Sequence, residues 1–477
     1  MITKKIILFL LLVGIQVSAQ DKKWTLRECI DYAVKNNISI KSSELDIKNA
    51  VINKKDAFGA FLPNVNASAS HSWNIGLNQN ITTGLLENQT TQFTQAGLNV
   101  GVDIYNGLKN QMQLRKSNLA IIASQYQMTK MQEDIALNVA NAYLQILFNK
   151  ENLKVQQEQK AYNLTQLDRT TQLVDAGVVP KGDLLDVKAT AAADSQRVIA
   201  AQNALLISKL SLAQLLRLDD FKNFDIDENQ IPELNEEILF QSSETIVKKA
   251  KETRTELKIA NTNVELAEKD IAIARASYQP TISGFYSFST RAAYSDRVVG
   301  VQPNATNPTS TVGFVEGTNQ LVLQPNFTPI LGNPLPVFDQ FSNNKGQNFG
   351  ISVNVPIFNG FATRNNVERS KVALERAKLN LSQQELDIER NVFTAYSDAN
   401  AAKESFEAAE ITLEARLLSF DYAKERYEVG LMNVFDFNQA QTLLVNAQSE
   451  VLRTKYDYLF RTKILEFYFG IPLIEKQ

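Results

Sequence analysis

Side chains able to carry out covalent or metal chemistry are scarce in this chain of 477 residues. It contains one histidine, His71, one cysteine, Cys29, and five methionines. One imidazole and one thiol cannot assemble a zinc or copper cluster within a single chain. His71 lies in a predicted strand, where a structural role is favoured over that of a general base. We expect Cys29 in a small core position of a helix, since one thiol forms no intrachain disulfide. No glycine-rich phosphate loop follows a strand, so we expect no enzyme activity, no metal and no cofactor.

Carboxylates are the remaining candidates for chemistry, and two of them recur at matched places. Asp183 lies six residues after Gly177, and Asp436 lies six residues after Gly430. Asp186 is a third acid in the first of these segments. A glycine at the end of a helix readily takes the positive φ that closes it, and acids in the next first turn are favoured by the helix dipole. The pattern therefore predicts two helical turns with acids just beyond them.

The matched positions belong to an internal duplication. A stretch of roughly 120 residues recurs 253 positions later without a gap, so that residues 98–107 align with residues 351–360. A weaker similarity at an offset of 217 relates the segments that end at Pro63 and Pro280. The second copy therefore has 36 more residues between its halves, and we expect this insertion to be a loop.

Each copy predicts long helices. From Leu108 to Asp175 apolar residues recur every seven positions along two seams, which is typical of coiled coils, and this helix would be about 100 Å long. Shorter helices are expected at 182–218 and 435–469, and opening helices at 25–61 and 242–278. The seams of the first copy are Leu114, Ile121, Met128, Ile135 and Ala142, and Val139, Ile146, Leu153, Leu167 and Val174, with Lys160 as the one break. The second copy repeats both seams, as Val367, Leu374, Leu381, Ile388 and Ala395, and as Val392, Ala399, Phe406, Leu413, Phe420 and Tyr427.

Strands are predicted where the helices stop. Residues 98–104 and 351–357 alternate between apolar and polar side chains. Facing strands are plausible at 64–73 and 281–289, which gives two hairpins with tips at residues 75–92 and 290–346. The second tip holds the insertion, which is rich in Pro, Gly, Asn and Thr and is expected to be an exterior polar loop.

The N-terminal residues resemble an export signal. Lys4 and Lys5 precede an apolar run that ends near Val17, and small residues up to Ala19 suit a signal peptidase. The run is shorter than the roughly 20 residues of a spanning helix, so a membrane anchor is disfavoured. We expect no later helix to span a membrane, and the formal net charge of −3 gives no reason to expect a nucleic-acid partner.

Alternating strands alone fit either a half-buried soluble sheet or a lipid-facing barrel. The export signal, polar hairpin tips and aromatic residues near strand ends favour the barrel. These membrane-interface aromatics are Trp73, Tyr105 and Phe358. Four strands cannot close a membrane barrel, because the smallest have about eight. Several chains must therefore share one barrel.

Three segments together resemble a known family. Trp24–Ala33 followed by Asn36 and Asn37, then Val355–Gly360, then Tyr427–Asp436 are similar to the outer membrane efflux proteins, the TolC-like outer membrane factors. The resemblance covers essentially the whole mature chain. It implies a homotrimer with a twelve-stranded barrel in outer membrane lipid and a long helical barrel crossing the periplasm of a Gram-negative bacterium. It also implies an exit duct that works with a periplasmic adaptor and an inner-membrane transporter of the RND or ABC type.

The resemblance assigns roles to the helical turns and the strand ends. It implies that the turns close the periplasmic end and meet the adaptor, with acids at the entrance, although Gln439 stands where relatives often carry a second acid. The tip residues are Gly177, Val178, Val179, Pro180, Gly430, Leu431 and Met432. The entrance and gating candidates are Asp436, Asp183 and Asp186. The junctions between strands and helices are Pro63, Gly107, Pro280 and Gly360.

The expected fold is mainly α with a small membrane β part, built from duplicated helical hairpins and four strands per chain. The expected divisions are a signal peptide at 1–19, repeats at 20–218 and 242–471, an acidic connecting segment at 219–241 and a tail at 472–477. The alternative is an exported soluble coiled-coil scaffold or binding protein with a β-domain. Within the duct interpretation, drug, metal and protein cargo remain open.

Overall fold

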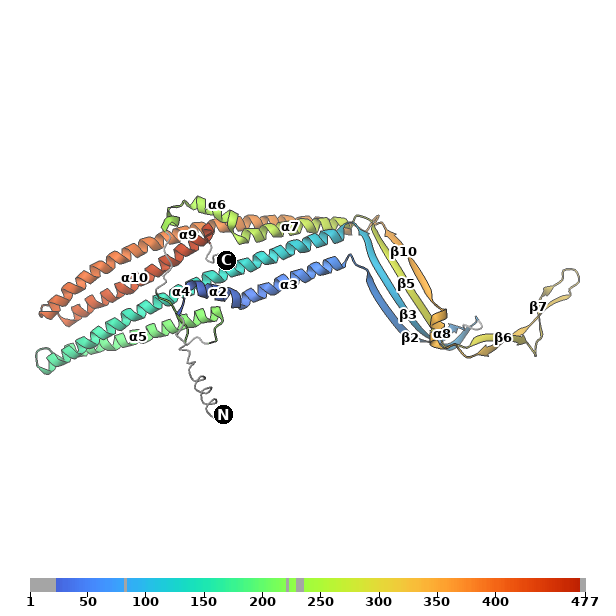
Figure 1. Ribbon diagram of the computed structural model, residues 1–477, viewed down its shortest axis with the longest axis horizontal. Helices are drawn as coiled ribbons and strands as arrows, with labels where there is room; N and C mark the ends of the chain where they lie inside the picture. The colour runs from blue at the N-terminus through green and yellow to red at the C-terminus, as the bar shows by residue number, and fades with distance from the viewer. Residues whose placement is uncertain (1–22, 81–83, 220–222, 229–235, 472–477) are drawn as a thin grey trace, which may run out of the picture. The chain divides into compact units, whose positions relative to one another are not determined.

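The computed structural model describes residues 23–80, 84–219, 223–228 and 236–471 (Figure 1). The chain divides into two compact units: residues 1–51, 118–268 and 372–477 form a helical unit, and residues 52–117 and 269–371 form a unit that contains the strands. The predicted signal peptide and C-terminal tail lie outside the described residues.

The helical hairpins are confirmed, and their lengths repeat exactly between the two copies. Helices α4 (Lys109–Asp175) and α9 (Ala362–Glu428) each have 67 residues. Helices α5 (Lys181–Leu216) and α10 (Val434–Phe469) each have 36. All residues of the predicted heptad seams are buried or half-buried, because the seams are the lines along which neighbouring helices pack.

The opening helix of each copy differs from the prediction, because it breaks in the middle. The first is α2 (Leu26–Asn36) followed by α3 (Ile38–Gly59), and the second is α6 (Ser243–Thr253) followed by α7 (Thr255–Ala276). The breaks fall at the equivalent residues Asn37 and Arg254, both with extended backbone.

Tertiary contacts explain both breaks. The Asn37 side chain donates to the carbonyl of Leu215 at 3.1 Å and accepts from the Ser39 amide at 2.9 Å. Arg254 is only 4% exposed, and its guanidinium binds Glu133 at 3.1 Å and Glu256 at 3.0 Å. Leu215 and Glu133 belong to other helices, whereas Ser39 and Glu256 lie two residues beyond the break, so the sequence shows only the local part of the cause.

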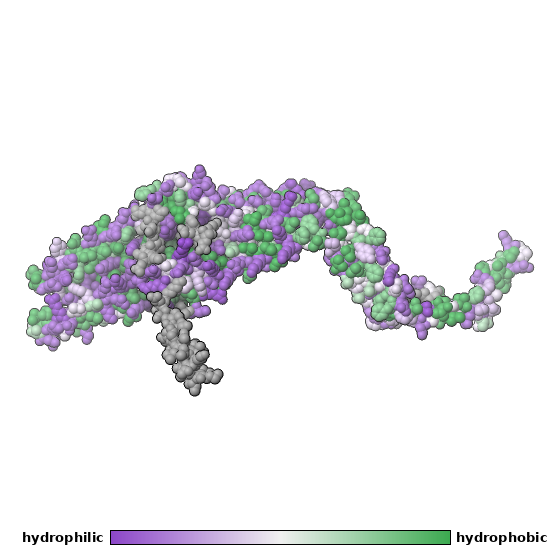
Figure 2. Space-filling model, in the orientation of Figure 1, coloured by the Kyte–Doolittle hydropathy of each residue, from purple (hydrophilic) through white to green (hydrophobic). Residues whose placement is uncertain are grey.

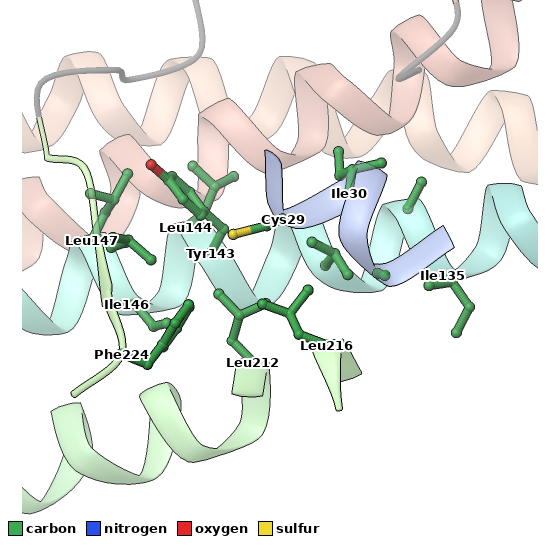
Figure 3. Packing of buried hydrophobic residues seen from close by; sticks show 14 of the residues in the cluster. Cys29, Ile30, Ile135, Tyr143, Leu144, Ile146, Leu147, Leu212, Leu216 and Phe224 are labelled. Atoms are coloured by element: carbon green, nitrogen blue, oxygen red, sulfur yellow. The ribbon is translucent and has the colours of Figure 1, made fainter. Parts of the chain in front are cut away.

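The core of the helical unit lies where the opening helices meet the hairpins (Figure 3). Cys29 and Tyr143 are fully buried and lie beside each other, which confirms the expected core position of the thiol. The Tyr143 hydroxyl donates to the carbonyl of Asp227 at 2.7 Å, and burial raises its pKa. A second cluster around Val392 and Ile246 occupies the equivalent place in the other copy.

The acidic connecting segment contributes to both clusters and is therefore more than a linker. Strand β1 (Lys23–Trp24) pairs in parallel with β4 (Asp225–Ile226), and a 3₁₀ helix covers Glu236–Phe240. Phe224 and Ile226 pack in the first cluster, and Ile238 and Leu239 pack in the second. Asp225 is held by Lys150 at 2.7 Å and Lys209 at 2.9 Å.

The second unit contains an antiparallel sheet of order β10-β5-β3-β2. Its strands are β2 (Asn64–Gln79), β3 (Leu86–Asn106), β5 (Thr281–Ala293) and β10 (Gly346–Asn354). The first three strands extend further toward the tips than predicted, so the first tip shrinks to residues 80–85. Strand β10 ends earlier than predicted, because Pro356 has no amide hydrogen to donate to a ladder.

The insertion is not the loop that the sequence predicted. Strand β6 (Arg297–Pro303) pairs with β9 (Phe327–Gly332), and β7 (Thr309–Phe314) pairs with β8 (Leu321–Pro325). Helix α8 (Val337–Asn343) follows. The Pro, Gly and Asn residues mark turns between short strands, which composition alone does not distinguish from irregular structure.

One helix in the described part of the chain, α5, is long and apolar enough to cross a membrane by length and composition, contrary to expectation. Within α5, Asp194 is 1% exposed, pairs with Arg197 at 3.0 Å and accepts from Asn163 of α4 at 2.5 Å. Lys209 of α5 pairs with Asp225 at 2.9 Å. These charged contacts are those of a helix packed within a helical layer.

Candidate functional site

The first helical turn ends α4 with a left-handed glycine. Gly177 has φ +74° and donates to the carbonyl of Val174 at 3.0 Å, while Val178 donates to Leu173 at 2.9 Å. This pair of bonds satisfies carbonyls that the helix end leaves open, and glycine takes the positive φ without steric cost.

The second turn has the same geometry. Gly430 has φ +78° and donates to Tyr427 at 3.1 Å, and Leu431 donates to Arg426 at 2.8 Å. The next helix begins differently in the two turns. Asn433 accepts from the Asp436 amide at 2.8 Å and donates to its carboxylate at 2.9 Å, whereas Pro180 makes no side-chain cap.

Apolar side chains are uncovered at both tips. Val178, Leu431 and Phe435 are each more than three-fifths exposed, and Pro180 is exposed, while Val179 and Met432 are half-buried. Exposed apolar groups gathered at a tip mark a surface that another protein can cover. The predicted tip residues thus lie together at the two turns.

A polar link joins the two hairpins just before their turns. Arg169 of α4 lies 4.0 Å from Glu428 of α9. Tyr427 hydrogen-bonds Thr170, and its ring stacks on Phe437 with centroids 4.5 Å apart. Burial raises the pKa of the Tyr427 hydroxyl, the nearby Asp183 carboxylate acts in the same direction, and the Thr170 hydrogen bond opposes both.

The three predicted acids occupy different surroundings. Asp183 is half-buried and lies close enough to Tyr427 of the other hairpin to act on its charge, whereas Asp186 and Asp436 are exposed. The sequence placed Tyr427 in a heptad seam and in one of the segments that resemble the family, but it did not predict the link to Thr170. Its position three residues before Gly430, opposite the first turn, is the signal that could have indicated it.

The strand register sorts the sheet into one apolar and one polar face. Residues directly opposite each other share a face. Figure 2 shows the hydrophobic residues over the sheet in green. The apolar face comprises Val65, Ala67, Ala69, Ala96, Leu98, Val100, Val102, Ile282, Gly284, Tyr286, Phe288, Phe349, Ile351 and Val353. The other face carries mainly Asn and Ser, including Asn66, Ser68, Ser70, Asn99, Ser287, Ser289, Asn348 and Ser352.

Two of the three predicted aromatics lie at opposite ends of the apolar face. Trp73 is 59% exposed and packs edge-on against His71, with centroids 4.3 Å apart. Tyr105 hydrogen-bonds Gln279 near the helix junctions. Phe358 lies beyond the end of β10, against Phe361, with centroids 5.5 Å apart. His71 is exposed on the same face as Trp73, and its Nδ1 lies 2.7 Å from the Thr94 hydroxyl.

The junctions where strands lead into the long helices are strained in the same way in both copies. Gly107 and Gly360 have φ +68° and +61°, and the following Leu108 and Phe361 have φ +66° and +65°. A side chain on Gly107 would collide with the carbonyl of Ala276, so only glycine fits there. Pro63 and Pro280 precede β2 and β5, where the opening helices have stopped.

Two further apolar seams are left without cover. On α3, Ile38, Leu45 and Ile52 are each more than half exposed. On α9, exposed residues recur every seven positions at Val372, Leu379, Leu386 and Phe393. Since α3 leads into β2 and α9 follows β10, the two seams belong to the helices joined to the two edge strands (Figure 1). The seven-residue spacing was visible in the sequence, but only exposure distinguishes these seams from the packed ones.

Comparison with known proteins gives consistent matches. The profile of the family described as "Outer membrane efflux protein" matches residues 29–216 and 246–470. Outer membrane protein TolC of Escherichia coli (strain K12) is 23% identical over 461 residues, which cover 94% of this chain and 83% of TolC. The solved Campylobacter jejuni CmeC outer membrane channel has a TM-score of 0.72 at 18% identity, covering 95% of this chain and 87% of CmeC. Outer membrane protein VceC from Vibrio cholerae has a TM-score of 0.71 at 14% identity, covering 93% of this chain and 96% of VceC.

Proposed function

The chain belongs to the outer membrane efflux protein family, and from that membership we propose that it is the passive exit duct of a tripartite efflux or type I secretion system. It is an outer membrane efflux channel of the TolC type, from a family of ducts and not of enzymes. We also propose how the channel assembles, where its gate lies and which partners it has, and we keep the domain boundaries expected from the sequence.

We propose that three copies close one shared barrel. Among the described residues, edge strands β2 and β10 each lack a neighbour on one side, and four strands are too few to close a membrane barrel. The helices joined to these strands carry the uncovered seams at Leu45 and Leu379. Pairing β10 of one copy with β2 of the next would bring α9 beside the next α3 and cover both seams. This match between open edges and open seams is the observation that carries the proposal.

The two faces of the sheet suit opposite surroundings. In the shared barrel the apolar face would contact outer membrane lipid, with Trp73 and Tyr105 near the two interfaces. The Asn- and Ser-rich face would line a water-filled lumen. A single-layered sheet with one largely apolar face has no other cover within the described part of the chain, which favours the duct over a soluble scaffold.

We propose that the tips form the closed periplasmic entrance. The link from Tyr427 to Thr170 and the pair Arg169–Glu428 would hold the hairpins together at rest. A periplasmic adaptor would cover the exposed apolar tips and loosen this link. The duct itself has no site for an energy-yielding reaction among its described residues, so an inner-membrane transporter of the RND or ABC type would drive transport.

The acids near the entrance would attract cations through their negative charge. Three copies of Asp436 would face one narrow opening, and rings of carboxylates favour cations. Asp183 contributes less to such a ring, because it is half-buried beside Tyr427. Asp186 is exposed but has Gln439 as its counterpart in the second copy.

The proposal is tested by fractionating membranes, measuring the mass of the detergent-solubilised protein and recording conductance in a planar bilayer. A trimer from the outer membrane fraction that conducts is the expected result. A heat-denatured sample serves as control for adventitious conductance. A soluble or non-conducting protein would refute the duct.

A further inference from the structure

The insertion of the second copy carries an amphipathic ribbon that the duct does not require. Strand β8, Asn326 and β9 run almost continuously from Leu321 to Gly332. The odd-numbered positions are all apolar: Leu321, Leu323, Pro325, Phe327, Pro329 and Leu331. The even-numbered positions are mostly polar or small. A period of two with one wholly apolar side is the pattern of a strand that buries one face.

The partner strands complete the same apolar face. Across β6–β9, Val298 lies opposite Leu331, Val301 opposite Pro329 and Pro303 opposite Phe327. Across β7–β8, Phe314 lies opposite Leu321, whereas Thr311 lies opposite Leu323 and Thr309 opposite Pro325, so this part of the face is apolar on β8 and mixed on β7. Asn326 joins the two strand pairs through bonds of 2.9 Å to Asn304 and Pro308. The result is one long two-stranded ribbon, which we call the insertion ribbon (residues 297–332).

No described part of the chain covers the apolar face of the insertion ribbon. Leu321, Leu323, Phe327 and Leu331 are each more than half exposed, as is Val301. The segment that contains β6 and β9 is largely green in Figure 2. A two-stranded ribbon is at best marginally stable in water, and a continuous apolar face of this kind marks a contact surface. Something must therefore cover it.

The charge of the ribbon indicates what covers it. From residue 298 to residue 338 the only charged residue is Glu316, at the turn between β7 and β8. A membrane surface with anionic headgroups would be met by several Lys or Arg, and a charged partner by opposite charges, yet the ribbon carries only Arg297 at its first residue and Glu316 at the turn. An uncharged apolar face fits another surface of the same kind, and depletion of charge is typical of the core of a protein interface.

The position of the ribbon in the chain supplies such a surface. It is inserted between β5 and β10, and β10 is an edge strand that the shared barrel would pair with another copy. Each copy would therefore bring its own ribbon to the same end of the barrel. We propose that the three insertion ribbons pack their apolar faces against one another around the trimer axis, with the polar faces outward. This proposal depends on the trimer of the proposed function.

Such packing would stabilise the trimer beyond the membrane strands and narrow the exit of the duct. Around a threefold axis, the apolar faces of all three ribbons can be buried at the same time. The unpaired long edges of each ribbon would lie beside the neighbouring copies, which also protects them from open-ended strand pairing.

Cysteine cross-linking tests the proposal in the full-length trimer. The chain's own Cys29 is fully buried and leaves the background low. Leu323→Cys and Val301→Cys place a thiol on the apolar face, and the neighbouring Gln324→Cys and Gln302→Cys place it on the polar face as matched controls. A short bismaleimide is added to the solubilised trimer and to intact cells, and the products are separated on a denaturing gel.

The expected result is a band at twice the monomer mass for the two apolar-face variants and its absence from the controls. A trimer by mass whose apolar-face thiols do not cross-link would overturn the packing while leaving the duct intact. A cross-link in cells to a different protein would also overturn it and would assign the face to that partner. A chain that is monomeric in detergent and in membranes would refute the trimer and the ribbon assembly together.

Discussion

At the scale of single residues, the informative contacts lie beside the two glycine turns. Tyr427 is held by its ring on Phe437 and by its hydroxyl on Thr170, so two different interactions secure one side chain. The ring belongs to its own hairpin, while the hydroxyl reaches the other. A substitution that removes only the hydroxyl therefore separates packing from the link between hairpins.

Tyr427→Phe should raise the open probability of the channel. It removes a hydrogen bond worth about 1 kcal/mol in each subunit, which is about a fivefold shift in the closed–open equilibrium for each subunit. Single-channel recording measures the change. Tyr422→Phe, an exposed position on the same helix, is the matched control. Equal open probabilities for the two variants would remove Tyr427 from the gate.

Asp436→Asn should weaken block by divalent cations at the periplasmic side. The substitution removes three charges from the proposed ring, while the Asn433 side chain can still accept from the backbone amide of residue 436. Current–voltage curves with and without a divalent cation give the readout. Asp421→Asn, an exposed acid on α9, controls for the overall charge. Block that is unchanged relative to this control would exclude the ring.

At the scale of elements, the long helices carry two kinds of apolar seam. One set of seams on α4 and α9 is buried or half-buried within the chain, while another on α9 is exposed. The connecting segment similarly contributes a strand and apolar side chains to the helical core, anchored by Asp225. The exposed seam on α9 and the ion pairs of Asp225 can each be tested by a substitution.

Leu379→Glu should prevent the trimer from forming. Leu379 is 71% exposed in one chain but covered in the proposed assembly, where an unpaired carboxylate would cost several kcal/mol. Light scattering of the solubilised protein reports its mass. Asn380→Glu, the adjacent exposed residue off the seam, should leave the trimer intact. A stable trimer of the Leu379 variant would contradict the proposed subunit contact.

Asp225→Asn should destabilise the helical unit at neutral pH by about 1 kcal/mol. Burial alone would raise the pKa of Asp225, but its bonds to Lys150 and Lys209 hold that pKa below the ordinary value. The ion pairs therefore contribute stability above the ordinary pKa of about 3.9, which is lost as the pH falls through the lower folded value.

Thermal unfolding followed by circular dichroism from neutral to acidic pH measures this effect. The wild type should melt above the Asp225 variant at neutral pH, and the two curves should converge in acid. Asp219→Asn, an exposed acid at the start of the same segment, should track the wild type throughout. A gap that persists in acid would show that the ion pairs are not its cause.

At the scale of the whole molecule, the proposed duct needs three copies of the chain. Its sheet has two open edges, its outer helices have two open seams, and its insertion ribbon has one open face. In the proposed trimer, further copies of the same chain would cover all three kinds of surface. The duct would then be a property of the assembly, since no membrane barrel can close with four strands.

A shared barrel should conduct as one unit. Single-channel records should show one conductance step for each trimer that enters the bilayer, because the three chains of a shared barrel enclose one lumen. Three equal sublevels, as from three independent pores, would contradict a shared barrel. Mass measurement on the same preparation shows whether the inserted species is a trimer.

Much of this architecture followed from sequence alone because it depends on local periodicity. The seven-residue seams of Ile135 and Ile388 reflect which face of a helix packs against its neighbours. The alternation at Val100 and Val353 separates the two faces of the sheet, and the glycines at the turns take the positive φ that ends each helix. Duplication reinforced these signals, since equivalent residues had to satisfy the same geometry twice.

Tertiary structure decided what depends on contacts between distant residues. Asn37 and Arg254 break their helices because Leu215 and Glu133 bind them, and these partners lie far away in the chain. Tyr427 keeps its place in the heptad seam and also contacts Thr170 of the other hairpin. Phe224 packs in a core cluster that its acidic neighbours in the sequence did not indicate. Periodicity in the sequence shows on which face of an element a residue lies. Its contacts with residues distant in the sequence form only when the chain folds.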